Sequence, residues 1–368
     1  MKTLKIILVL ISLLGLFACR EDIPVNVDGN STIRLVALWD TSTVEGVIKN
    51  VPLQGAKVIL NSEYGTFVRY LDNEGKISID KIPASTYDIA VRMPHPLDQN
   101  IIIVGNVKNV KVSPNSSVID TIKGMAVSSS GISINEIYAC GPQNNIYFFY
   151  DQYIELYNSS DSTKYLDGMM VMRVSGNGEG EQKGPGADEG DDGDIDGVTY
   201  VFKFPGSPGE KNYPFYPKTF IILASDGVNH KNSMPNAVDL SHADWEFYNQ
   251  YSATDIDNPA VPNLINIRSD RTVDFLISLI NDVIVVSSGV DSVWSDGIDI
   301  NTVIDGVEYQ TSGNTLKTLD SRIDRGWVKS PPTYSGKSMQ RREPGVDTND
   351  GQLDWEILSA PTPKVHRW

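Results

Sequence analysis

The sequence is poor in cysteine, with only Cys19 and Cys140 among its 368 residues. At most one disulfide can form, so the fold must be stabilised by hydrophobic cores, for which a chain of this length has ample material. Cys140 is expected to be a small buried side chain. A nucleophilic thiolate needs a neighbouring base, and the sequence places none of the four histidines beside Cys140.

Positive charge is also scarce. The chain has 31 Lys and Arg residues against 47 Asp and Glu residues, and its formal net charge is -16. Nucleic acid is disfavoured as a partner, because a polyanion requires basic residues clustered on one face. Binding to an anionic lipid surface through a polybasic patch is disfavoured for the same reason. Divalent cations and basic proteins remain compatible with this charge.

Motifs of common enzymes are missing as well. The sequence contains no G-x-S-x-G elbow, no phosphate-binding P-loop and no G-x-G-x-x-G fingerprint after a strand. Carboxylates are so numerous that some pair falls at any spacing, and a glycosidase pair therefore cannot be assigned. The sequence predicts that the protein is not an enzyme, with no catalytic residue and no certain cofactor.

Long hydrophobic runs are also scarce, and the main one has only eleven residues, from Ile6 to Leu16. A bilayer core of about 30 Å needs about twenty helical residues, so this run cannot span it. It follows Lys2 and Lys5 and precedes Leu16-Phe17-Ala18-Cys19, an order that resembles a lipoprotein signal peptide. The resemblance implies that residues 1–18 are removed and that Cys19 is lipidated. A buried apolar helix or an uncleaved anchor is the alternative.

Residues 19–31 contain turn formers without apolar periodicity and are expected to be a tether. The pair Glu21-Asp22 resembles the acidic surface-export signal of Bacteroidota lipoproteins, and an ordinary polar linker is the alternative. We therefore expect an outer-membrane lipoprotein that faces the cell exterior.

Short alternating runs separated by turns fill residues 32–127 and predict an all-β sandwich. In the turn Asp72-Asn73-Glu74-Gly75, Gly75 would supply the positive φ angle, and Pro83 would end the strand before it. The expected strands are Ile33–Leu38, Ala56–Leu60, Thr66–Leu71, Lys76–Ile79, Tyr87–Val91 and Ile101–Val104.

This first region resembles the prealbumin-like domain of the carboxypeptidase regulatory family. The resemblance rests on residues 52–58, on the run 72–79, on Ile82-Pro83 and on Thr86-Tyr87. Ser85 departs from the glycine that the family usually has before its Thr-Tyr step. Domains of this type are structural spacers or docking surfaces without catalytic residues.

Serine-rich stretches near Ser129 predict a domain boundary, and residues 128–368 form the second domain. Residues 132–138, 151–160 and 165–168 resemble the opening of a lamin-tail domain, which is an immunoglobulin-like β-sandwich, and residues 338–342, 347–350 and 354–355 resemble its closing motif. Long insertions must separate the two motifs. Most of residues 33–368 resemble a Bacteroidota lipoprotein family of unknown function that joins both domain types, so the expected fold is two β-sandwiches with one or two short helices.

An acidic, glycine-rich run from Gly176 to Gly197 is expected to be a solvated loop. Inside it, Asp192, Asp194, Asp196 and Gly197 follow the D-x-D-x-D-G start of a calcium loop. Lys203 replaces the bidentate glutamate at position twelve, which excludes a complete EF-hand. A partial calcium site, with Asp188 or Glu189 helping, is one interpretation, and a loop without an ion is the other.

A weaker calcium candidate combines Asp255, Asp257 and Asn258. His230 and His242 could take part in a metal site, although no recognised ligand spacing occurs, so a turn at Asn229-His230 and a short helix over Ser241–Tyr251 are the simpler expectation.

Arg341 and Arg342, together with His230, are the candidate partner-binding residues. The arginines could clamp a carboxylate or phosphate of a partner, or pair with acidic residues between Glu343 and Asp354. Aromatic residues 147–150 could pack inside the sandwich or form an exposed partner or glycan surface.

The sequence as a whole predicts a non-catalytic binding module that serves a neighbouring TonB-dependent transporter or captures an extracellular ligand. Two alternatives remain open, namely a calcium- or metal-dependent hydrolase in the second domain and a structural or adhesive envelope protein.

Overall fold

The computed structural model describes residues 29–39, 50–96, 101–128, 131–176, 183–313 and 315–366. The predicted signal peptide, Cys19 and most of the predicted tether lie outside these residues. The described chain is nearly all β, with one α-helix, α2 (Gly351–Asp354), and two 3-10 turns, η2 (His230–Asn232) and η3 (Ile300–Thr302). The predicted all-β class is therefore confirmed. None of the described helical segments is long and apolar enough to cross a membrane.

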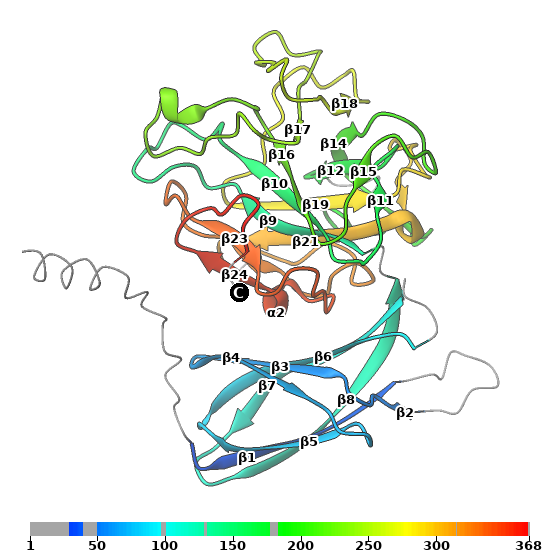
Figure 1. Cartoon of the computed structure of the whole chain (residues 1–368), viewed down its shortest axis with the longest axis vertical. Coiled ribbons are helices and arrows are strands. Elements are labelled where there is room, and N and C mark those ends of the chain that lie inside the picture. The colour runs from blue at the N-terminus through cyan, green and yellow to red at the C-terminus, as the bar shows by residue number, and fades with distance from the viewer. Residues whose placement is uncertain are drawn as a thin grey trace, which may run out of the picture.

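Residues 29–128, here called the front unit, form two sheet layers that share the long strand β8 (Figure 1). The hydrogen-bonded order is β2-β1-β8-β7-β6-β3-β4. Strand β5 also pairs with β1, on the same edge as β2 and opposite β8. The strands are β1 (Ser31–Trp39), β2 (Val51–Pro52), β3 (Lys57–Ser62), β4 (Gly65–Tyr70), β5 (Lys76–Ile82), β6 (Ser85–Pro94), β7 (Ile101–Val112) and β8 (Ser117–Ser128). Each strand predicted in this region is present, with ends shifted by a few residues.

Alternation explains the core of the front unit. Along β1 the side chains of Ile33, Leu35 and Ala37 are fully buried, whereas the residues between them are more exposed. They pack against inward residues of β3 and β6 such as Val58 and Ile89. The predicted turn before β5 is confirmed, since Gly75 has a φ angle of 70° and Asp72 accepts the N–H groups of Glu74 and Lys76.

The first and last strands of the front unit run in the same direction. Strand β1 pairs in parallel with β8 from Thr32 opposite Ser117 to Trp39 opposite Gly124. Strand β8 then pairs antiparallel with β7 through its last residues, from Met125 to Ser128. It therefore belongs to both layers and joins them along one side.

Residues 131–366, here called the back unit, contain two six-stranded sheets, ordered β17-β16-β10-β9-β23-β24 and β18-β14-β12-β19-β21-β22. The strands are β9 (Ile132–Tyr138), β10 (Tyr153–Asn158), β11 (Lys164–Tyr165), β12 (Met170–Val174), β13 (Asp194–Ile195), β14 (Val198–Lys203), β15 (Pro214–Phe215), β16 (Phe220–Ala224), β17 (Trp245–Glu246), β18 (Ile265–Asn266), β19 (Asn281–Ser287), β20 (Ile298–Asp299), β21 (Val303–Gln310), β22 (Val328–Lys329), β23 (Ser338–Arg341) and β24 (Trp355–Leu358).

A single core lies between these two sheets. It joins Ile154 and Leu223 of the first sheet to Phe202, Ile284 and Val307 of the second. The outer faces are covered as well, so that every residue of β9 and β10 is buried. An insertion that contains Val238 and Leu240 supplies part of this cover. Residues 361–365, which follow the last strand, cover Glu136 and Glu155, so that these polar residues are enclosed rather than exposed.

The helix predicted over Ser241–Tyr251 is wrong. The segment instead contains β17, which runs parallel to β16, with Trp245 opposite Leu223. Asp239, rather than a helix N-terminus, binds the Ser241 side chain at 2.7 Å. Burial of Trp245 and Phe247 in the core outweighs the local capping signal, because tertiary packing overrides weak helix propensity.

Candidate functional site

The back unit meets the front unit through residues 343–356, here called the closing segment, which lies against β3, β6 and β7 (Figure 1). Val346 and Leu353 pack on Ile59 and Ala90 of the front unit. The junction also has complementary charges. Lys57 pairs with Glu343, and Lys108 Nζ lies 2.6 Å from a carboxylate oxygen of Asp350.

Two cavities open beside this junction, and we call them together the junction groove. The smaller, of about 220 Å³, lies between strands β3 and β4 and the closing segment. The larger, of about 360 Å³, lies between β22, α2 and β24. Arg342 and Glu356 line both cavities, and Trp327, Lys329, Gln352 and Trp355 line the larger one. Its volume falls in the range of small-molecule sites. The lining of this larger cavity comes from the back unit alone, and only the smaller cavity lies between the two units.

Arg342 is held loosely in the groove. Its Nη1 atom is 3.4 Å from the Thr66 hydroxyl and 3.5 Å from the Glu356 carboxylate, both at the limit of a hydrogen bond. Its Nε atom is buried and has no hydrogen-bond partner. Burial lowers the pKa of Arg342, while the Glu356 carboxylate opposes the shift. A guanidinium in this state can donate hydrogen bonds to a carboxylate, phosphate or hydroxyl oxygen of a ligand.

Arg341, the neighbouring partner-binding candidate, is fully buried. Its guanidinium donates to Asp305 at 2.8 Å and to Asp354 at 3.4 Å, and its Nε donates to the Ile134 carbonyl at 2.7 Å. The predicted pairing with acidic residues between Glu343 and Asp354 is present for Arg341, through Asp347 and Asp354, and Asp305 is an additional partner. Side chains of β23 alternate between the two faces of the sheet, and that of Arg341 points to the enclosed face. It therefore offers no surface to a partner.

His230 is buried in η2, where its Nε2 atom lies 3.2 Å from the Asp226 carbonyl and its ring meets Phe148 edge-on. Burial lowers the pKa of His230. The Asp226 side chain belongs to an enclosed acidic cluster with Glu246 and Asp255: burial and neighbouring carboxylates, first among them Asp255, raise the pKa of Asp226 to about 8, and burial raises that of Glu246 to about 7. The His230 ring contacts the Asp226 main chain and Phe148 and is not a surface group.

The predicted calcium ligands lie in residues 188–196, a segment that is held to the rest of the back unit by an ion pair and by a buried side chain. Arg322 binds the Asp188 carboxylate at 2.6 Å and keeps the pKa of Asp188 below its usual value. Ile195 is fully buried, so residues 183–197 are not simply a solvated loop. Within the described chain, no three His, Cys, Asp or Glu side chains are grouped to hold a metal ion. The calcium site involving Asp192, Asp194 and Asp196 stays a prediction.

The calcium prediction has a direct test. If the ion binds, calcium should raise the melting temperature, and the Asp192→Asn/Asp194→Asn variant should lose that rise. The Asp194 carboxylate lies near those of Asp192, Asp291 and Asp299, and partial burial together with these negative charges raises the pKa of Asp194. Equal melting curves with calcium and with EDTA would refute the site.

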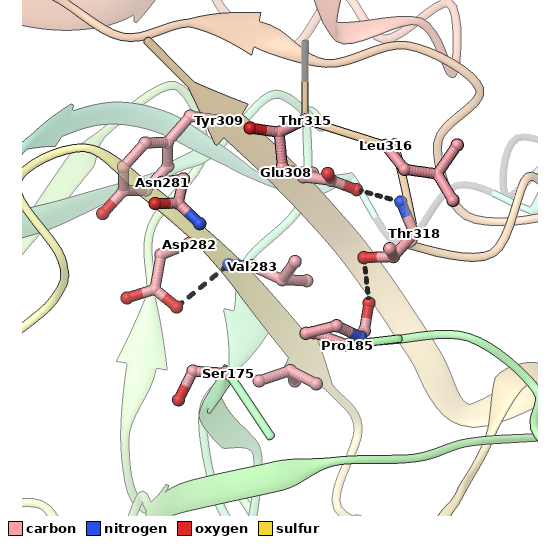
Figure 2. A pocket seen from close by; sticks show the side chains of 11 residues that line it. Ser175, Pro185, Asn281, Asp282, Val283, Glu308, Tyr309, Thr315, Leu316 and Thr318 are labelled. Atoms are coloured by element: carbon pink, nitrogen blue, oxygen red, sulfur yellow. Dashed lines mark hydrogen bonds between the residues drawn. The ribbon is translucent and has the colours of Figure 1, made fainter. Parts of the chain in front are cut away.

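A third cavity, of about 100 Å³, lies beside β19 and β21 (Figure 2). Both of its carboxylates already have partners. Asp282 accepts from Arg173 Nε at 2.6 Å, and Glu308 accepts the N–H groups of Thr318 and Leu319. The cavity is smaller than typical ligand sites of about 300 Å³ or more, and no free charged group points into it.

The aromatic residues at 147–150 form a partly exposed loop. Tyr147 is 82% exposed and Ile146 is 59% exposed, whereas the rings of Phe149 and Tyr150 stack at 5.1 Å. Both sequence interpretations hold in part, since this loop packs at one side and presents an apolar tip at the other. Cys140 is buried as expected, and its Sγ lies 2.9 Å from the Lys337 carbonyl.

Sequence reasoning missed most of the groove. Trp327, Lys329 and Gln352 stand in no motif, and only the fold brings them to Arg342. The one local signal was the Arg341-Arg342 pair, of which Arg341 is the buried last residue of β23 and Arg342 lies just beyond the strand and lines the groove.

Comparison with known proteins gives a family match for part of the chain. Residues 217–293, from just before β16 into the loop after β19, match the family described as a protein of unknown function (DUF4876). No curated protein matches the sequence. The crystal structure of a DUF4876 family protein from Bacteroides thetaiotaomicron VPI-5482 matches with a TM-score of 0.54 and 22% identity, over 88% of this chain and 94% of that one.

Another solved structure overlaps far less. A candidate carbohydrate binding protein from Bacteroides uniformis ATCC 8492 gives a TM-score of 0.19 and 11% identity, over 53% of this chain and 99% of that one. A similarity of this size supports no conclusion about fold or ligand. Residues 217–293 of this chain thus match the DUF4876 family model, and the chain shares the fold of a DUF4876 protein.

Proposed function

We propose that this protein is a non-catalytic binding protein, attached to the outer membrane through lipidated Cys19 and facing the cell exterior, whose ligand occupies the junction groove. The observation that carries the proposal is the Arg342 guanidinium, which lines both adjoining cavities and makes only long side-chain contacts of 3.4 and 3.5 Å through Nη1. A ligand oxygen that accepts a hydrogen bond from this charged group would contribute about 1.5–3 kcal/mol.

The groove favours a small ligand that combines an anionic or oxygen-rich group with an apolar face. In the larger cavity Arg342 and Lys329 face one carboxylate, that of Glu356, so positive charge is in excess there, whereas the smaller cavity places Arg342 among Glu343, Asp354 and Glu356. The indole of Trp327 is half-buried and can cover an apolar or sugar-ring face, while Gln352 can donate and accept hydrogen bonds.

The test is a titration of the intact chain with a panel of neutral and acidic oligosaccharides and small carboxylates, followed by tryptophan fluorescence and calorimetry. Trp327 and Trp355 lie in the groove and should report binding. We expect Arg342→Ala to weaken binding at least tenfold, which corresponds to about 1.4 kcal/mol.

The matched control is Arg69→Ala, since Arg69 is exposed on β4 and donates only to the carbonyl of its neighbour Val68. This variant should bind like the unmodified chain. A ligand whose affinity is unchanged in Arg342→Ala and in Trp327→Ala would place the binding site elsewhere and refute the groove.

Delivery of the bound ligand to a neighbouring TonB-dependent transporter completes the proposal. A second candidate function, adhesion at the cell surface, is favoured by the exposed tip formed by Ile146 and Tyr147. Isolated apolar side chains are common on surfaces, but adjacent ones at a loop tip fit a protein or glycan contact. Cells carrying Tyr147→Ser should then adhere less while retaining ligand uptake.

A further inference from the structure

Two glutamates lie enclosed on the outer face of the first back-unit sheet. Glu136 of β9 and Glu155 of β10 stand directly opposite each other, and both are 0% exposed. Burial and the adjacent Glu136 carboxylate raise the pKa of Glu155 to about 8. Such a pair is costly to bury and requires donors on every side.

The donors come largely from one short segment, residues 361–365, which we call the proline turn. The Glu136 carboxylate accepts the Thr362 N–H at 3.0 Å and the Thr362 hydroxyl at 3.1 Å. The Glu155 carboxylate accepts the Lys364 N–H at 2.6 Å. Pro361 and Pro363 have no N–H group, so the two bound donors are the only main-chain donors between residues 361 and 364.

The turn has a defined shape. The Val365 N–H donates to the Thr362 carbonyl at 2.9 Å, and Lys364 has a φ angle of 60°. Pro363 at the second position and a positive φ angle at the third are the features of a type II turn. A lysine in this conformation costs of order 1 kcal/mol relative to glycine, so the surrounding contacts must hold it there.

The sheet also recognises the acceptors of the turn. Gln340 of β23 donates from Nε2 to the Val365 carbonyl at 3.2 Å and to the Thr362 hydroxyl at 2.8 Å. Three adjacent strands, β10, β9 and β23, therefore direct one side chain each at the turn. Half of these contacts involve main-chain atoms of the turn, two involve the Thr362 hydroxyl, and Lys364 adds an ion pair with Asp244 at 2.8 Å. This arrangement recognises a backbone shape set by two prolines together with the threonine hydroxyl between them.

We propose that the Glu136, Glu155 and Gln340 face is a binding site for a proline-framed turn of a partner peptide, and that residues 361–365 occupy it in cis. The site is distinct from the junction groove and does not depend on the ligand proposed there. A partner peptide of the type Pro-Thr-Pro-Lys would present the same two N–H groups and the same hydroxyl, and could replace the internal turn.

The experiment uses the full chain with a protease site placed at the exposed Ser359-Ala360 step, so that the segment can be cut after folding. A fluorescently labelled peptide of residues 360–366 is then added, and binding is followed by fluorescence polarisation. Mass spectrometry measures the release of the native segment. We expect the cut chain to bind one peptide and the uncut chain to bind at least 100-fold more weakly, since its own turn competes at high effective concentration.

Two modified peptides test the contacts. Methylation of the Thr362 and Lys364 main-chain nitrogens removes both bound donors and should weaken binding at least tenfold. Replacing Lys364 by glutamine retains both N–H groups, loses only the Asp244 pair and should change the affinity less than about threefold, as surface ion pairs contribute little. Three outcomes would overturn the proposal: unfolding of the chain on cutting, no binding to the cut chain, or equal affinity of the methylated peptide.

Discussion

Replacing Arg341 by methionine is expected to lower the free energy of unfolding by about 3–5 kcal/mol, the usual cost of leaving a buried ion pair without one partner. Arg341 is the cation shared by Asp305 and Asp354, and both carboxylates are buried. Without the guanidinium they must be protonated or hydrated inside the fold. Chemical denaturation at pH 7, fitted as a two-state transition of the back unit, measures the change.

The adjacent arginine provides the matched control. Arg342→Met removes the same charge from the next residue of the chain, but Arg342 makes only contacts of 3.4 and 3.5 Å. Its loss should cost less than about 1 kcal/mol. Adding Asp305→Asn to Arg341→Met should restore part of the stability, because coupled residues are not additive. Similar losses in the two single variants would show that Arg341 is not the centre of this network.

Stability is expected to fall by several kcal/mol between pH 5 and pH 8. The folded state raises the pKa of Asp226 and Glu155 to about 8 and that of Asp324 to about 7, in each case first through burial. The unfolded chain releases these protons near pH 4, so the folded state binds more protons between pH 4 and 8. These three carboxyl groups contribute their full stabilisation below their pKa values in the unfolded chain. That stabilisation is lost as the pH rises through their pKa values in the folded state.

Thermal melting at constant ionic strength from pH 5 to 9 measures this loss as a decrease of several degrees in the melting temperature. The double variant Asp226→Asn/Glu155→Gln should flatten the profile, since neutral amides carry no ionisation cost. Asp161→Asn, at a side chain that is 95% exposed, should leave the profile unchanged. A melting temperature that rises from pH 5 to pH 8 would contradict the assignment.

The strands of the front unit could be predicted well from sequence, because the alternation of buried and exposed residues that identifies them lies within short windows of the chain. Alternating residues such as Ile33, Leu35 and Ala37 identify a strand and the face that is buried. The turn at Gly75 follows from the same short window. In the back unit, strands covered on both faces lose this contrast, and the buried Glu155 carries no local sign of its enclosure.

The candidate site depended on contacts between distant residues. Arg341 and Asp305 are 36 residues apart, and Lys57 meets Glu343 across 286 residues. A single sequence gives no measure of such pairings, so the two adjacent arginines could be proposed as a pair but not distinguished. The helix expected after Ser241 failed for a related reason, because the burial of Trp245 is decided by its partner strand β16.

The parallel pairing of β1 with β8 has a mechanical consequence. Because the two strands run in the same direction, the chain enters the front unit at the start of β1 and leaves it at the far end of β8, which has 12 residues and is about 40 Å long. A force that pulls the back unit away from the segment before Ser31 would load the β1–β8 hydrogen bonds in shear. All eight residue pairs would then bear the load together, instead of opening one after another as in a zipper.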